Sequence, residues 1–146
     1  MTAACSYTSI TNGNITLSVN DDMHYKVMSS AEGADAYHSD FQAADAIIAD
    51  EALIDSWKLR EVKECGCEEG KTYTLYGTWK EDGYEIEKIL TVRTLPDFED
   101  MVLISSSYVN HSDKILTVKA LESNKLSVKS DEVIWSFQPT STARRD

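Results

Sequence analysis

Hydrophobic residues recur at every second position along most of this sequence, and turn-forming residues divide the pattern into short runs. Successive side chains of an extended strand point to opposite faces of a sheet, so the pattern predicts strands with one buried face. Ile15–Val19 is the first such run, and it follows the turn signal Asn12-Gly13. After Asn20-Asp21-Asp22, the segment Met23–Val27 repeats the alternation, and the two runs predict a first hairpin.

The strongest hairpin signal lies in the middle of the chain. Tyr73–Trp79 and Tyr84–Val92 both alternate, and Asp82-Gly83 stands just before the second run. Asp-Gly supplies the positive φ angles that a tight hairpin turn needs, so turn chemistry and periodicity predict the same pairing. Further strands are predicted downstream at Met101–Val109, Ile115–Leu121, Lys125–Val128 and Val133–Gln138.

The segment Ala43–Leu59 admits two interpretations. Its alanines and isoleucines can share one face of a helix. Alternatively, Asp50-Glu51 is a turn between one strand at Ala46–Ala49 and another at Leu53–Leu59. We favour the two strands, because the segments on either side have the same alternating character.

Short strands with turns between them predict an all-β fold with little helix, in the form of an antiparallel β-sandwich. A closed β-barrel is the second choice. The chain has 146 residues, which suffice for one hydrophobic core and not for two. We therefore expect a flexible N-terminal segment at residues 1–11 and a single β-sandwich domain at residues 12–146, either complete or as a fragment of a larger enzyme.

Charge narrows the classes of partner. The sequence has 25 acidic and 14 basic residues, for a formal net charge of -11, and such a surface repels nucleic acid. No apolar run reaches the roughly 20 residues that cross a membrane as a helix. Ala3-Ala4-Cys5 is similar to the end of a bacterial lipoprotein leader, and the alternative is an ordinary cysteine in a chain terminus.

Cysteines and histidines do not form a metal-binding pattern. Cys65 and Cys67 lie one residue apart, but structural zinc needs four ligands, and a second pair is missing from the sequence. The three histidines are scattered, so we expect no metal and no cofactor, and we interpret the two cysteines as part of a turn.

Familiar catalytic motifs are also absent, including phosphate loops, nucleophile elbows and HExxH. Acidic residues are abundant enough for a glycosidase pair to arise by chance, so we interpret them as a solvated face. The acidic residues considered were Asp45, Asp50, Asp55, Asp97, Glu99 and Asp100. Trp57 and Trp79 have the same strand parity as neighbouring leucines, which favours core positions over sugar stacking.

Four segments of the sequence, taken in order, carry a resemblance to a known family. They are Asn12–Val19 with Tyr25–Val27, Gly77–Trp79 with Tyr84–Val92, Tyr108–Lys114, and Ile134–Gln138 with Arg144–Asp146. The series resembles the N-terminal β-sandwich domain that precedes the catalytic barrel in bacterial α-galactosidases and related melibiase-type glycoside hydrolases. This resemblance covers most of the chain from Asn12 onward.

The resemblance implies a non-catalytic domain that packs on the catalytic barrel of the same enzyme and helps to form the rim of its sugar site. The family's catalytic aspartates lie in the barrel, so no catalytic residue is carried over to this chain. We expect Trp135 and Gln138 to contact the sugar. The resemblance also implies a periplasmic or extracellular protein, with a leader that this sequence lacks.

Two other classes of function remain open from the sequence. A lipocalin-like barrel would hold a small apolar ligand in one internal cavity. A free-standing carbohydrate-binding module would instead present a row of exposed aromatic side chains on one sheet face and bind sugar as an isolated chain.

Overall fold

The computed structural model describes residues 6–32, 36–50 and 52–129. Within these ranges the chain forms ten strands and no helix, and every paired strand is antiparallel to its neighbour. The strands are β1 Tyr7–Asn12, β2 Ile15–Asn20, β3 Tyr25–Ser29, β4 Ala46–Ala49, β5 Leu53–Ile54, β6 Lys58–Cys67, β7 Gly70–Glu81, β8 Tyr84–Leu95, β9 Phe98–Asn110 and β10 Val118–Glu122. The described part of the chain contains no helix long and apolar enough to span a membrane.

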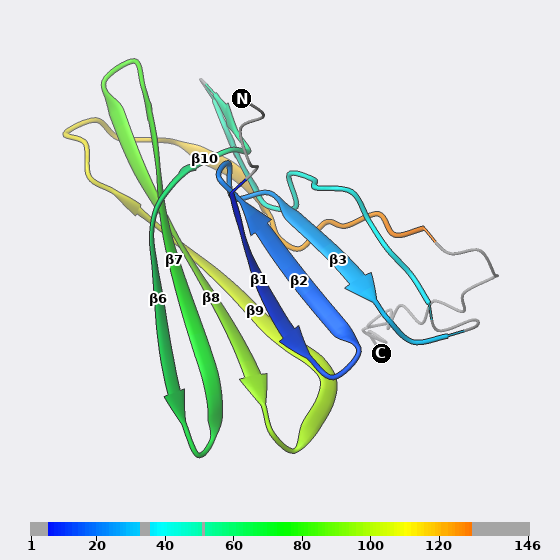
Figure 1. Cartoon of the computed structure of the whole chain (residues 1–146). Coiled ribbons are helices and arrows are strands. Elements are labelled where there is room, and N and C mark those ends of the chain that lie inside the picture. Colours follow the sequence, from blue (N-terminus) through cyan, green and yellow to red (C-terminus); the bar gives the residue numbers. More distant parts are fainter. Residues whose placement is uncertain (1–5, 33–35, 51, 130–146) are drawn as a thin grey trace, which may run out of the picture.

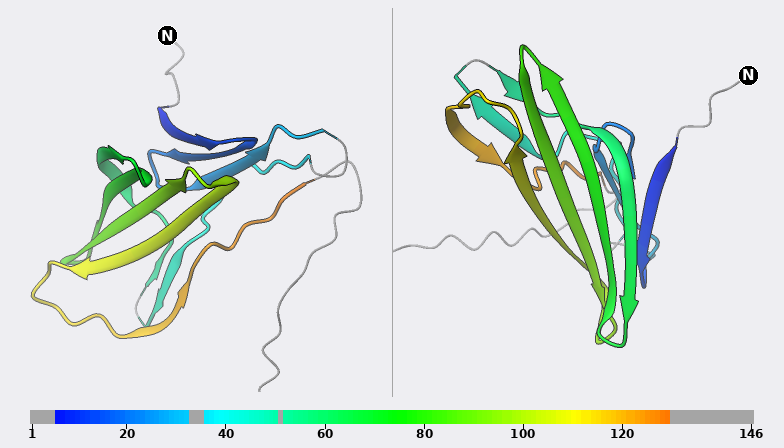
Figure 2. Two further views of the ribbon diagram at one scale, coloured as in Figure 1. Left: turned by 90° about the horizontal axis from the view of Figure 1, so that it is seen from below. Right: turned by 90° about the vertical axis from the view of Figure 1, so that its left-hand side faces the viewer.

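The strands form three sheets, with the orders β1-β2-β3, β6-β7-β8-β9 and β10-β4-β5 (Figure 1). The first sheet lies as a separate layer against one face of the long four-stranded sheet (Figure 2). A side chain joins these two layers at one end, where the Asn12 amide donates hydrogen bonds to the carbonyl oxygens of Phe98 and Met101 at 2.8 and 2.7 Å. The fold is therefore all-β and sandwich-like. The closed barrel is excluded, because each described sheet keeps two edge strands.

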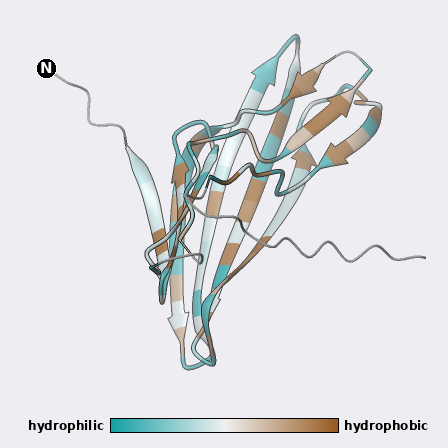
Figure 3. Ribbon diagram, turned by 90° about the vertical axis from the view of Figure 1, so that its right-hand side faces the viewer, coloured by the Kyte–Doolittle hydropathy of each residue, from teal (hydrophilic) through white to brown (hydrophobic). Residues whose placement is uncertain are grey.

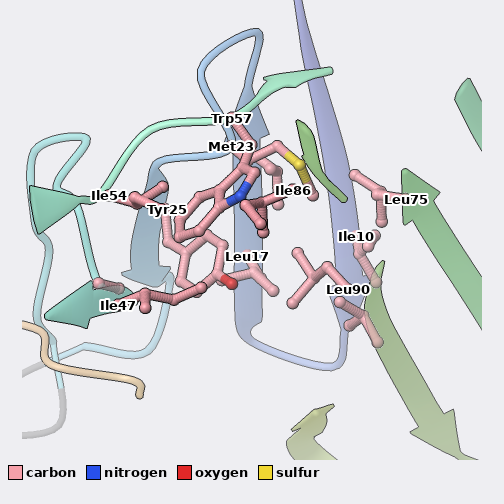
Figure 4. Close-up of a cluster of buried hydrophobic side chains, with 13 residues drawn as sticks. Ile10, Leu17, Met23, Tyr25, Ile47, Ile54, Trp57, Leu75, Ile86 and Leu90 are labelled. Atoms are coloured by element: carbon pink, nitrogen blue, oxygen red, sulfur yellow. The ribbon is translucent and has the colours of Figure 1, made fainter. Parts of the chain in front are cut away.

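One hydrophobic core holds the sheets together. Side chains from β1, β2, β3, β4, β5, β7 and β8 point toward a common centre, together with Trp57 and Met23 from the connecting segments (Figure 4). Hydrophobic and polar residues alternate along the ribbon, as strands with one buried face require (Figure 3). Burying each large aliphatic or aromatic side chain stabilises the fold by about 1.5–3 kcal/mol, so this cluster carries most of the driving force.

Both predicted hairpins are confirmed. β2 pairs with β3. β7 pairs with β8 along nearly all of their length, from Lys71 opposite Thr94 at one end to Glu81 opposite Tyr84 at the turn. At the second turn Asp82 has a φ of 51° and Gly83 a φ of 81°, which are the positive angles that Asp-Gly was expected to supply.

The segment Ala43–Leu59 is also strand rather than helix. β4 and β5 pair as a short antiparallel hairpin, with Ile47 opposite Ile54 and Ile48 opposite Leu53. β6 begins at Lys58, so the predicted second strand is divided in two. Trp57 lies between the two pieces, and its side chain is 1% exposed.

The structure differs from the sequence-based expectations at both ends of the described chain. Residues 7–11, assigned above to a flexible terminus, belong to β1, which pairs with β2 from Tyr7 opposite Asn20 onward. Lys125–Val128 was predicted as a strand and is not one, although Lys129 makes an isolated bridge to His38. Lys125 and Lys129 donate backbone hydrogen bonds to Ala44 and His38, but Ser127 between them bonds to the side chain of Gln42, so no continuous backbone ladder forms. The predicted strand at residues 133–138 lies outside the described residues.

Candidate functional site

A lysine occupies the centre of the core. Lys88 lies on the inward face of β8 between Ile86 and Leu90, and its residue is 0% exposed. Alternation along the strand forces this position inward, because the neighbours two residues away on each side are buried aliphatics. Burial lowers the pKa of the Lys88 ammonium, and the nearby Asp45 carboxylate opposes that shift only in part.

Asp45, directly before β4, is the partner of this lysine. Its Oδ2 atom lies 2.6 Å from Lys88 Nζ and accepts hydrogen bonds from the Tyr25 hydroxyl and from Ser106 Oγ, the latter at 2.7 Å. Its Oδ1 atom accepts the backbone N–H of Asn124 at 2.8 Å. Burial raises the pKa of Asp45, but the Lys88 ammonium and these donors outweigh burial and hold the pKa below its usual value.

Aromatic rings enclose the ammonium group. Lys88 Nζ lies 4.7 Å from the centre of the Tyr25 ring and 4.9 Å from that of Trp57, within the range of cation–π attraction. Nζ also donates a hydrogen bond to the Tyr25 hydroxyl at 2.8 Å. Burial and the Asp45 carboxylate raise the pKa of Tyr25, so its hydroxyl remains protonated and acts as a donor to Asp45.

A pocket of about 450 Å³ adjoins this cluster and lies between β9, β4 and β10. Ser106 connects the buried cluster with the pocket, because its hydroxyl donates a hydrogen bond to Asp45 and the residue also lines the pocket. Tyr108 also lines the pocket, and its hydroxyl has no hydrogen-bond partner within the described residues. Burial and the Asp45 carboxylate raise the pKa of Tyr108 to about 12. The remaining lining is mainly aliphatic, from Ile47, Ile86, Leu116, Val118 and Leu121.

A second pocket of about 450 Å³ lies beside the β7–β8 turn and is more polar. Trp79 and Tyr84 line it with their rings stacked, at 6.5 Å between centroids and 29° between planes. Glu81, Asp82 and Lys114 complete its polar lining, and Lys114 Nζ lies 5.1 Å from the centre of the Tyr84 ring. Aromatic faces beside charged groups are the side chains that bind sugar rings and their hydroxyls.

The sequence-predicted residues have different outcomes. Trp57 is in the core as predicted, and the half-buried Trp79 packs against that core. Asp45 was interpreted as part of a solvated face, and this is wrong, because the residue is 2% exposed and ion-paired. Trp135 and Gln138, the expected sugar contacts, lie outside the described residues, as does Cys5.

Cys65 and Cys67 are exposed free thiols in the last residues of β6, next to the turn before β7. In the described ranges, no three His, Cys, Asp or Glu side chains gather as a metal site would require.

Lys88 is the site residue that the sequence analysis missed as a candidate. It stands within the predicted strand Tyr84–Val92, at a position whose parity points into the core. A charged residue at an inward position was the available signal, because lysine is almost never fully buried without a partner. No sequence pattern near Lys88 identified Asp45 as that partner.

The buried cluster does not resemble a catalytic centre for a dissolved substrate. Lys88 and Asp45 side chains are at most 1% exposed, so a substrate cannot reach either group. Comparisons with protein-family models, curated proteins and solved structures returned no match. The geometry is that of a structural polar core next to an open apolar pocket.

Proposed function

We propose that this chain is a non-catalytic β-sandwich domain of a glycoside hydrolase, which packs on the catalytic barrel and contributes to the rim of its sugar site. One observation carries the packing role. Val118 and Leu121 are 46% and 59% exposed, and both line the mouth of the apolar pocket beside β10. Exposed apolar side chains gathered around a pocket are typical of a surface that another protein domain covers.

The assignment to a glycoside hydrolase comes from the sequence resemblance. The segments that carry the resemblance include β2, β3, the β7–β8 hairpin and the end of β9, which all belong to the two facing sheets. Its partner in the proposal is the catalytic barrel, whose loops form the sugar site.

The native polypeptide provides the test. An antibody raised against this chain should recognise a polypeptide well above the 16.3 kDa of the chain, and removing that antigen should remove α-galactosidase activity from the extract. An antigen of 16.3 kDa whose removal leaves the activity intact would overturn the proposal.

Two substitutions in the native enzyme test whether the surface around Val118 and Leu121 contacts the barrel. Leu121→Glu places a charge at the pocket mouth and should lower the melting temperature of the barrel. Phe98→Glu is the matched control, because Phe98 is 56% exposed at the start of β9 and does not line the pocket. Equal effects of the two variants would remove this surface from the interface.

A second candidate, a carbohydrate-binding module, is favoured by the pocket beside the β7–β8 turn. Trp79 and Tyr84 present stacked rings there, next to two carboxylates and a lysine. A module predicts that the isolated chain binds galactosides or polysaccharides, with a change in tryptophan fluorescence that Trp79→Leu removes. Absence of heat and of a fluorescence change at millimolar sugar would eliminate it.

A further inference from the structure

The buried Lys88 and Asp45 side chains meet under conditions that favour a covalent reaction between them. Nζ and Oδ2 are 2.6 Å apart, and both side chains are at most 1% exposed. Effective concentrations in well-oriented intramolecular reactions reach about 10⁵–10⁸ M, far above those of free amines and acids. The surrounding core also excludes the water that would hydrolyse an amide product.

The two oxygens of Asp45 have different environments, and the difference matches the needs of an acyl transfer. Oδ1 receives the Asn124 backbone N–H at 2.8 Å, which is the kind of donor that stabilises a developing oxyanion. Oδ2 accepts hydrogen bonds from the hydroxyl groups of Tyr25 and Ser106 and lies against the Lys88 ammonium. The oxygen that must leave as water is thus the one in contact with the ammonium that supplies its protons.

We propose that Lys88 and Asp45 join through an intramolecular isopeptide bond. The Nζ atom attacks Asp45 Cγ, the new Nζ–Cγ bond forms, and the Cγ–Oδ2 bond breaks. Nζ loses two of its three ammonium protons, and both leave with Oδ2 as one water molecule. The reaction converts an ammonium and a carboxylate into a neutral amide and water, so it needs no oxidant, reductant or further reactant.

Energetics of the core support this step. Two buried charges carry a large desolvation penalty, and a neutral amide removes both of them. The exposed pair Lys119–Asp50 has a similar Nζ–Oδ1 distance of 2.5 Å, but its side chains are 63% and 42% exposed. Water keeps that pair ionised, so it remains a salt bridge.

The isopeptide bond would be a covalent cross-link between two sheets. Lys88 is in the middle of β8, and Asp45 precedes β4 in a different sheet. Within the described residues the cysteines are free thiols, so no disulfide supplies such a cross-link there. A covalent link between distant chain positions stabilises a fold mainly by restricting the unfolded chain.

Intact mass measured on the unfolded, reduced chain tests the proposal. The expected mass is lower than that of the sequence by one water, about 18 Da. Proteolytic fragments should include one branched species that joins the peptide containing Asp45 to the peptide containing Lys88. The full sequence mass after prolonged incubation of the folded chain at neutral pH would overturn the proposal, and this result requires no variant to fold.

Variants and one chemical control exclude other sources of the same mass change. Lys88→Met and Asp45→Ala should both show the full mass, whereas the matched control Lys119→Met should keep the loss of water. A succinimide at Asp82-Gly83 would also lose one water, but it reopens in mild alkali and an amide does not. Loss of water that persists in Lys88→Met, or that reverses in mild alkali, would refute the isopeptide bond.

Discussion

Removal of the Lys88 ammonium should leave Asp45 as a charge buried without its counter-ion, and the consequence can be measured with two variants. Lys88→Met keeps the length and apolar stem of the side chain. Lys88→Met combined with Asp45→Asn also removes the carboxylate, and neither protein can form an ion pair or an isopeptide bond. The difference in their unfolding free energies therefore isolates the cost of the unpaired carboxylate.

The magnitude follows from the contacts of Asp45. Leaving one partner of a buried pair uncompensated typically destabilises a protein by about 3–5 kcal/mol. Tyr25, Ser106 and the Asn124 backbone N–H remain as donors to the carboxylate, so we expect the lower part of that range. At pH 7 the single variant should be less stable than the double variant by about 3 kcal/mol.

The same pair of variants should show a defined pH dependence. Without Lys88, the dominant influence on Asp45 is burial, which raises its pKa in the folded state above the value of about 3.9 in the unfolded chain. A raised folded pKa contributes stability below the unfolded pKa, and this contribution is lost as pH rises through the folded pKa. The stability gap between the two variants should therefore be smallest near pH 4 and grow toward pH 7.

Urea denaturation followed by tryptophan fluorescence measures this gap, because Trp57 is buried against the cluster. Denaturant slopes should be equal in the two variants, so that midpoints report stability rather than compactness. Equal stabilities at pH 7, or a gap that does not change between pH 4 and pH 7, would refute the electrostatic account of the core.

Three further outcomes follow from local geometry. Gly77→Ala should destabilise the fold by about 1–3 kcal/mol in thermal or urea unfolding, because a Cβ there would lie 2.1 Å from Met23 Sδ and 3.0 Å from Trp57 Cβ. Gly83→Ala should cost about 1–2 kcal/mol at the positive φ of the β7–β8 turn, and an unchanged midpoint would contradict the strain. Cys65 and Cys67 should both react with a thiol reagent in the folded chain at the rate of exposed cysteines, and protection of either would contradict their exposure.

Local chemistry explains which parts of the fold were predictable from sequence. The β7–β8 hairpin was found because Asp82-Gly83 and the alternation on either side act over a few residues. β1 was missed because Tyr7–Asn12 has few large apolar residues, and only Ile10 is fully buried. Its pairing with β2 supplies most of the stabilisation that its own side chains lack.

The candidate site was less predictable, since its parts come together only through tertiary packing. Lys88 had a readable inward position, but Asp45 belongs to the segment in which helix and strand were both open. The pocket depends on how β10 packs beside β4, with Leu121 opposite Ile47 and Glu122 opposite Ala46. No short-range pattern specifies that pairing.

The polar cluster also has a consequence for how the sheets are assembled. Tyr25 comes from the β1–β3 sheet, Lys88 and Ser106 come from the long sheet, and Asp45 leads into the third. An apolar cluster of the same volume would accept several relative positions of the sheets, because contacts between aliphatic side chains have no fixed direction. Directional hydrogen bonds to one carboxylate accept only one position. Substitution of Asp45 together with Lys88 by leucine and methionine should therefore broaden the NMR signals of core methyl groups, and sharp signals would show that apolar packing alone fixes the arrangement.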